Sequence, residues 1–301
     1  MAGFFGFFDY TKPGKGVSKD DVAKTGVSLY FDILGRRFWK LILLNLFYII
    51  ASIPAIIITW FISTYFVTWT ASIAGLNIEE NASALLLLGI VLSVIIFQGC
   101  GSGPATAAMN YVLRKYVNDT HSWVWADFVD NIKSNFRQGI CVYVINTLVL
   151  CISTFGFVFY TYSVGGYLGV FFRTIVTLII AVFLMMQMYT YQLMAGFELK
   201  VKDIYKNALL LTLIKLPQNI LYAAVVAAIM YAVYSLSLSV PLAGILVVAL
   251  LLFTLVSFTQ IFMTNNIIKK YVLNPYLEQN PSEEQELPSP DFEDRISVDE
   301  I

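Results

Sequence analysis

Long apolar runs that contain no Asp, Glu, Lys, Arg or His dominate the chain. Five such runs cover residues 41–78, 81–113, 138–172, 174–197 and 216–268. A helix that crosses a bilayer needs about 20 predominantly apolar residues, so each run is long enough for at least one span. The last run carries the turn-like sequence Ser-Leu-Ser-Val-Pro at 237–241 and therefore predicts two helices joined by a tight turn.

This pattern predicts an all-α, polytopic membrane protein with six transmembrane helices. We place them near residues 41–62, 84–103, 139–160, 175–195, 219–237 and 241–264. Aromatic residues typical of a membrane–water interface lie at the ends of the first and third helices: Trp60, Tyr65, Phe66, Trp69, Tyr160, Tyr162 and Tyr167. We expect a cytoplasmic or interfacial segment at 1–40, a transmembrane domain at 41–270 and an acidic, disordered tail at 271–301.

Two of the loops between spans have helical periodicity. In the first, Val124, Phe128, Ile132 and Phe136 recur every four residues; in the second, the apolar positions are Val201, Ile204, Tyr205, Ala208 and Leu211. Both predict amphipathic helices lying at the membrane surface. Two explanations fit this pattern. Either the chain consists of three repeated units, each an interfacial helix followed by a transmembrane hairpin, or any cytoplasmic loop that enters a membrane acquires basic and amphipathic character.

Composition and charge narrow the class of protein. Apolar residues make up 58% of the chain and charged residues only 13%, whereas a soluble protein is about one quarter charged. A soluble globular enzyme is therefore excluded. The net charge of −1 gives no basic excess, so nucleic acid is not an expected partner.

The basic residues also predict an orientation. Of the 19 Lys and Arg residues, all except Arg173 fall on one side of the six predicted spans. Because the Lys- and Arg-rich side is cytoplasmic, we expect both termini inside the cell.

The most distinctive stretch surrounds residues 98–116. Gly99, Gly103 and Ala107 are spaced four apart, as in a ridge of small residues that lets another helix approach closely. Pro104 suits the first turn of a new helix, so a broken helix that presents its amides to an anionic ligand is the other interpretation. Residue 103 should lie near the cytoplasmic surface, whereas transport sites at broken helices lie near the membrane midplane. Its position therefore favours the first interpretation, a contact with another helix.

Candidates for chemistry are few. Gln187 and Tyr191 share a helical face and could contact a sugar-like solute, although hydrogen bonding between helices is the commoner role of such residues. The spans hold no Asp, Glu, Lys, Arg or His, which disfavours ion coupling. The sequence has no phosphate-binding G-x-x-x-x-G-K-[ST] motif and no metal-ligand spacing around His121. We therefore expect no catalytic residue, cofactor or metal.

Several blocks resemble the YesL family of bacterial membrane proteins. They are residues 7–17, Gly-Pro-Ala-Thr-Ala-Ala at 103–108, Tyr-Val-Leu-Arg-Lys at 111–115, Trp-Ala-Asp-Phe at 125–128 and Asn-Phe-Arg-Gln at 135–138. The similarity extends to about residue 275 and excludes the acidic tail. It implies a multi-pass protein of the bacterial cell membrane, encoded beside carbohydrate ABC importers, and it supplies no catalytic or binding residues.

Three functional hypotheses follow. The first is a non-enzymatic accessory subunit of an oligosaccharide ABC importer that associates with its permease subunits. The second is a free-standing facilitator or exporter of a neutral solute. A membrane enzyme is the third, and it has the least support. The gene neighbourhood implied by the resemblance favours the first.

Overall fold

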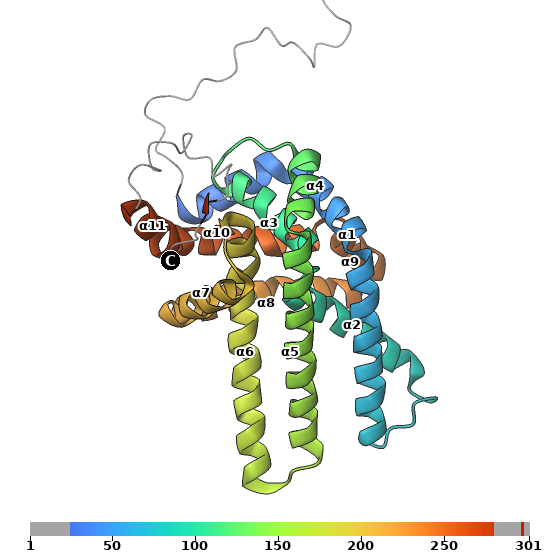
Figure 1. Ribbon diagram of the computed structural model, residues 1–301. Helices are drawn as coiled ribbons and strands as arrows, with labels where there is room; N and C mark the ends of the chain where they lie inside the picture. Colours follow the sequence, from blue (N-terminus) through green and yellow to red (C-terminus); the bar gives the residue numbers. More distant parts are fainter. Residues whose placement is uncertain (1–24, 280–295, 298–301) are drawn as a thin grey trace, which may run out of the picture. The chain divides into compact units, whose positions relative to one another are not determined.

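The computed structural model describes residues 25–279 and 296–297 (Figure 1). The chain divides into two compact units, Met1–Arg36 and Arg37–Ile301, with the boundary inside the first helix. The described part of the smaller unit is helical, and Asp32 and Arg36 form an ion pair of 2.9 Å one turn apart. Residues 1–24 of the predicted N-terminal segment 1–40, and most of the predicted acidic tail 271–301, lie outside the described residues.

The described elements are almost entirely helical. They are α1 (Gly26–Ile73), α2 (Ala82–Cys100), α3 (Pro104–Val117), α4 (Val124–Ser134), α5 (Phe136–Tyr162), α6 (Gly166–Gly196), α7 (Val201–Ile214), α8 (Leu216–Ser239), α9 (Pro241–Val247), α10 (Phe253–Ile268) and α11 (Asn274–Gln279). Strands β1 (Phe197–Glu198) and β2 (Ile296–Ser297) pair in parallel. The all-α prediction is confirmed.

Five helices in the described residues are long and apolar enough to cross a membrane. They are α1, α5, α6, α8 and the continuous helical stretch Pro241–Leu273, while part of α2 forms a shorter apolar helix, Ala82–Val94. The chain is therefore a membrane-type protein, and the count of six spans stays a prediction. α5 and α6 pack side by side as an antiparallel hairpin (Figure 1).

The helical stretch from Pro241 to Leu273 contains a π-turn, Val248–Leu252, where α1 inserts a side chain. Asn45 donates its amide to the Ala249 carbonyl at 2.9 Å and accepts from the Thr254 backbone amide at 3.0 Å. A π-turn shifts the i→i−4 hydrogen-bond pattern. The Asn45 side chain supplies hydrogen-bond partners to the backbone of this π-turn and so connects α1 to the helical stretch Pro241–Leu273.

Helix α3 is the main departure from the predicted organisation, which had placed these residues at a span end and in a loop. Ten residues of α3 are buried, and the helix packs against α4, α5, α6 and α10. Ala105, Ala107 and Ala108 are at most 3% exposed. Such small side chains let neighbouring backbones approach the first turns of α3 closely, while Met109 and Leu113 bury larger apolar side chains further along the helix.

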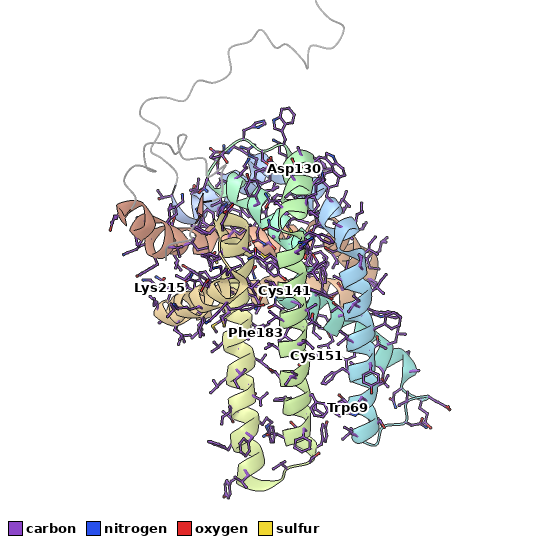
Figure 2. The ribbon with its side chains drawn as sticks, in the orientation of Figure 1. Trp69, Asp130, Cys141, Cys151, Phe183 and Lys215 are labelled. Carbon is purple, nitrogen blue, oxygen red and sulfur yellow. The ribbon has the colours of Figure 1, made fainter. Side chains whose placement is uncertain are left out.

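Helices α4 and α7 confirm the two predicted loop helices, but the buried face of α4 differs from the prediction. Val124, Phe128 and Asn131 are buried, whereas Phe136 starts α5 and is 53% exposed. Asp130 lies on the exposed face of α4 (Figure 2). The expected stripe is interrupted because the chain leaves α4 at Asn135, one residue before α5 begins. The interfacial position of both helices stays a prediction.

Candidate functional site at a helix break

The second apolar segment breaks between Cys100 and Pro104. Gly101 and Gly103 adopt φ values of 69° and 71°, a region that glycine enters without the penalty that other residues incur. Pro104 then starts α3, where its missing amide hydrogen costs nothing. The Ser102 backbone amide donates to Thr106 Oγ1 at 2.7 Å. Two glycines, a proline and one hydroxyl thus end one helix and begin the next.

This break contradicts two predictions: the small residues do not form one continuous ridge, and the helix does not continue to residue 103, because α2 ends at Cys100. Gly99 lies in α2, whereas Ala107 lies in α3. Because the positive φ angles of Gly101 and Gly103 interrupt the helix between them, these residues do not share one helical face. Gly99 and Gly103 still lie at close approaches. A Cβ atom on Gly103 would lie 2.6 Å from the Gly139 carbonyl oxygen, and one on Gly99 would lie 2.9 Å from Leu184 Cδ2. These contacts join helices of the same chain.

The carbonyl at the end of α2 is capped by side chains from α5 and α6. Cys100 O accepts hydrogen bonds from Asn146 Nδ2, at 3.1 Å, and from the Tyr191 hydroxyl. Asn146 Nδ2 also lies 2.8 Å from Gln187 Oε1, and Tyr205 donates to Asn146 Oδ1 at 2.6 Å. The last carbonyls of a helix lack intrahelical partners, and an unsatisfied one in lipid costs several kcal/mol. The network removes that cost.

Hydroxyl groups tie α1 to the start of α3. Ser52 donates to Ser102 Oγ at 2.7 Å, and the hydroxyls of Ser102 and Thr106 lie 3.2 Å apart. Tyr48 shares a hydrogen bond of 3.2 Å with Thr106 Oγ1. The break is therefore held from both sides by neutral polar groups.

A small cavity of about 20 Å³ lies beside the break. Its lining comprises Tyr48, Gly99, Gly101, Thr106, Met109, Asn110, Gln187, Tyr191, Ser257 and Gln260. The volume suits about one water molecule and is far too small for a sugar ring. Gln187 Nε2 is buried and has no hydrogen-bond partner among the described residues, so an acceptor such as a water oxygen would satisfy this donor.

The break brings the two predicted sets of site residues together. Gly99, from the proposed ridge, shares the cavity lining with Gln187 and Tyr191, from the proposed solute face. Gly103, Pro104 and Ala107 are buried, and they lie in the same stretch of sequence as Gly101 and Thr106, which also line the cavity. The hydroxyls of Ser52, Ser102 and Thr106 were not predicted, and their only signal in the sequence is that polar residues interrupt apolar runs.

A second polar region lies at the other end of α3. Burial lowers the pKa of the Arg114 guanidinium to about 10, so the group remains protonated at neutral pH. Lys115 pairs with Asp127 at 3.5 Å and Ser122 donates to the same carboxylate at 2.7 Å. Lys269 donates to Asn118 Oδ1 at 2.8 Å. Charged contacts therefore fix the last turn of α3 against its neighbours.

Within the described residues, no group of three or more His, Cys, Asp or Glu side chains is arranged to hold a metal ion. Burial raises the pKa of the Tyr205 hydroxyl on α7, which keeps this group a neutral hydrogen-bond donor to Asn146. The site as described is a set of neutral amides, hydroxyls and one backbone carbonyl.

The all-α fold and the five span-length helices define a membrane protein. Residues 81–157 match the family model described as a protein of unknown function, DUF624. This segment runs from the start of α2 to late α5 and includes the whole helix break. Searches of curated proteins and of solved structures find no match.

Proposed function

We propose that the chain is a non-enzymatic accessory subunit of an oligosaccharide ABC importer in the bacterial cell membrane. It associates with the two permease subunits through transmembrane contacts, spans the bilayer six times and keeps both termini in the cytoplasm. The energy for uptake comes from the importer, and this chain contributes to assembly.

The exposed surface of α8 is the observation that carries the proposal. No residue in the most apolar 18-residue window of α8 is buried within the chain, whereas 44% of the corresponding window in Pro241–Leu273 is buried. Ala224, Ala228 and Ala232 are spaced four apart and are all exposed. Small residues at this spacing favour close association with another transmembrane helix.

The family resemblance supports the choice of partner. The block at 103–108 and its basic continuation at 111–115 resemble the YesL family, and both fall within the residues that match the model of unknown function. Carbohydrate importers are the neighbours that this resemblance implies. The permease subunits are the membrane-embedded part of such an importer, so they are the expected partners for α8.

Co-purification tests this proposal. The native chain, extracted in mild detergent, should carry the two permease subunits, and its deletion should abolish oligosaccharide uptake. Ala228→Leu should release the permeases, because the larger side chain separates the helices. Ala51→Leu, the same change at an exposed position of α1, should retain them. A chain that purifies alone or as a homo-oligomer, with uptake unchanged by its deletion, contradicts the proposal.

A facilitator of a neutral solute is the alternative, and the helix break favours it. Transport sites are often built where helices are discontinuous, and here the break is lined by uncharged polar groups. Solute flux through proteoliposomes that contain only this chain, reduced by Gln187→Leu, would support this function over the accessory role.

A further inference from the structure

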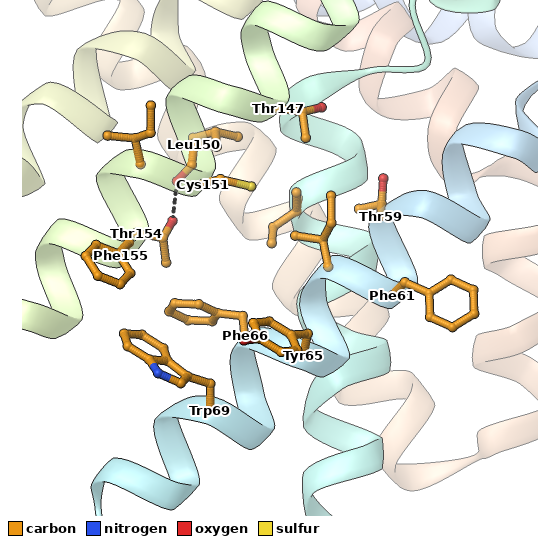
Figure 3. Close-up of a pocket in the computed structure, with 13 residues that line it drawn as sticks. Thr59, Phe61, Tyr65, Phe66, Trp69, Thr147, Leu150, Cys151, Thr154 and Phe155 are labelled. Carbon is orange, nitrogen blue, oxygen red and sulfur yellow. Dashed lines mark hydrogen bonds between the residues drawn. The ribbon is translucent and has the colours of Figure 1, made fainter.

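A second and much larger cavity, of about 640 Å³, lies between α1 and α5 (Figure 3). It is lined by Thr59, Phe61, Ile62, Tyr65, Phe66, Trp69, Ile96, Thr147, Leu150, Cys151, Ile152, Thr154 and Phe155. Its volume falls within the range of about 300–1,000 Å³ that is usual for small-molecule sites. It shares no lining residue with the small cavity at the helix break.

The lining selects an apolar ligand. The indole of Trp69 stacks on the ring of Phe155, with centroids 5.2 Å apart. Thr59 and Thr154 donate their hydroxyls to carbonyls of their own helices, Ala55 at 2.7 Å and Leu150 at 2.6 Å. The Thr147 hydroxyl is buried and has no hydrogen-bond partner among the described residues, but one such group cannot replace the hydration that a sugar or a charged solute would lose here.

The cavity opens between exposed side chains of two span-length helices. Phe61, Tyr65 and Ile152 are 62%, 74% and 70% exposed, and they lie within α1 and α5, which are long and apolar enough to cross a membrane. In a bilayer, the medium that reaches this opening is lipid hydrocarbon rather than water.

The length of the cavity matches one leaflet. Its lining on α1 runs from Thr59 to Trp69, which at 1.5 Å per residue is about 15 Å. The hydrocarbon core of a bilayer is about 30 Å thick, so one leaflet contributes about 15 Å. Trp69 lies four residues, or about 6 Å, before α1 ends at Ile73. The aromatic end of the cavity therefore lies toward the end of the helix, and the Thr59 end lies deeper.

We propose that this cavity is a binding site for one acyl chain of a bilayer phospholipid. The chain enters between α1 and α5 with its headgroup beyond Trp69 and its terminal methyl toward Thr59 and Thr147. The site bridges two helices whose stacked residues, Trp69 and Phe155, are 86 residues apart in sequence. A bound chain thus fills space that the side chains leave open and joins these helices.

Photocrosslinking tests the site on the full-length protein in nanodiscs. The probe is a phosphatidylglycerol with a diazirine in the middle of one acyl chain, and the labelled peptides are identified by mass spectrometry. We expect labels concentrated on residues 59–69 and 147–155. Labels spread equally over these peptides and the exposed apolar faces of α6 and α8 would overturn the proposal.

Two cysteines on α5 give a matched pair of variants. Cys151 lines the cavity, whereas Cys141 is exposed and lies outside it (Figure 2). Cys151→Phe should fill the cavity and reduce labelling of its peptides to the level of α6. Cys141→Phe should leave labelling unchanged. Both variants must elute as the native protein does, and equal labelling of two such folded variants contradicts the proposal; the map of the native protein tests it independently of either variant.

Discussion

At the residue scale, the Cys100 carbonyl depends on side chains of other helices for its hydrogen bonds. It ends a helix within an apolar environment, and two side chains from α5 and α6 donate to it. Asn146 has a wider role than Tyr191, because it also contacts Gln187 and accepts from Tyr205. Replacing Asn146 therefore removes hydrogen bonds to the Cys100 carbonyl, Gln187 and Tyr205. Removing the Tyr191 hydroxyl still leaves the Cys100 carbonyl one donor.

This difference predicts unequal effects on stability. Tyr191→Phe should lower the free energy of unfolding by about 0.5–1.5 kcal/mol, the usual range for one interhelical hydrogen bond. Asn146→Leu should cost more, about 1–3 kcal/mol, because it leaves buried partners unsatisfied. Thermal unfolding of the detergent-solubilised protein measures both. A Tyr191→Phe protein that is less stable than Asn146→Leu would show that Asn146 is not the junction.

At the element scale, the periodicity of the sequence identified α4 and α7 but not α3. The loop helices carry large apolar residues such as Phe128 and Ile204 at helical spacing, and bulk at that spacing is the signal that a pattern search detects. α3 also buries large apolar residues, Met109, Leu113 and Tyr116, but most of α3 continues the charge-free run 81–113, so the pattern does not separate it from the span before it. Its first turns are buried through Ala105, Ala107 and Ala108, and their burial depends on how closely neighbouring backbones approach, which is a property of the assembled helices.

The same reasoning separates the predicted from the missed site residues. Gln187 and Tyr191 stand out in an apolar run because they are large and polar, and both reach the break. Ser52 and Ser102 are small, and most hydroxyls in such helices bond to their own backbone. Their contact joins positions 50 residues apart, which no local pattern encodes.

The contact between α5 and the start of α3 gives a prediction for helix packing. A Cβ atom on Gly139 would lie 2.5 Å from Pro104 N and 2.8 Å from Pro104 Cα, and backbone atoms cannot move aside at little cost. Gly139→Ala should therefore destabilise the protein by about 1–3 kcal/mol. Gly156→Ala on the same helix should be neutral or slightly stabilising, because its Cβ would meet only Val176 Cγ2 at 3.8 Å. Equal melting temperatures for the two variants would refute this packing role.

At the scale of the whole molecule, exposed apolar surface is a property of the fold. α5, α6 and α8 bury 17%, 11% and 0% of their most apolar windows. In water such surfaces would drive aggregation, whereas lipid solvates them without penalty. The bilayer is therefore the medium in which this arrangement of helices is stable.

The proposed topology predicts a pattern of cysteine accessibility. In a background without the three native cysteines, Asn77→Cys, Gly166→Cys and Ser239→Cys should react with an impermeant maleimide added to intact cells. Asp130→Cys, on the exposed face of α4, should react only after the cells are opened. The reason is the concentration of Lys and Arg on one side of the spans. Labelling of Asp130→Cys in intact cells would reverse or disprove this orientation.

The helix break also determines when the protein can be completed during its synthesis. The side chains that cap Cys100 follow it by 46 and 91 residues. At about 5–20 residues per second, translation supplies the second cap about 5–18 s after the carbonyl itself. The end of α2 is thus synthesised before either of its capping side chains, and a ribosome that stalls between residues 146 and 191 leaves the Cys100 carbonyl with one donor, Asn146, instead of two.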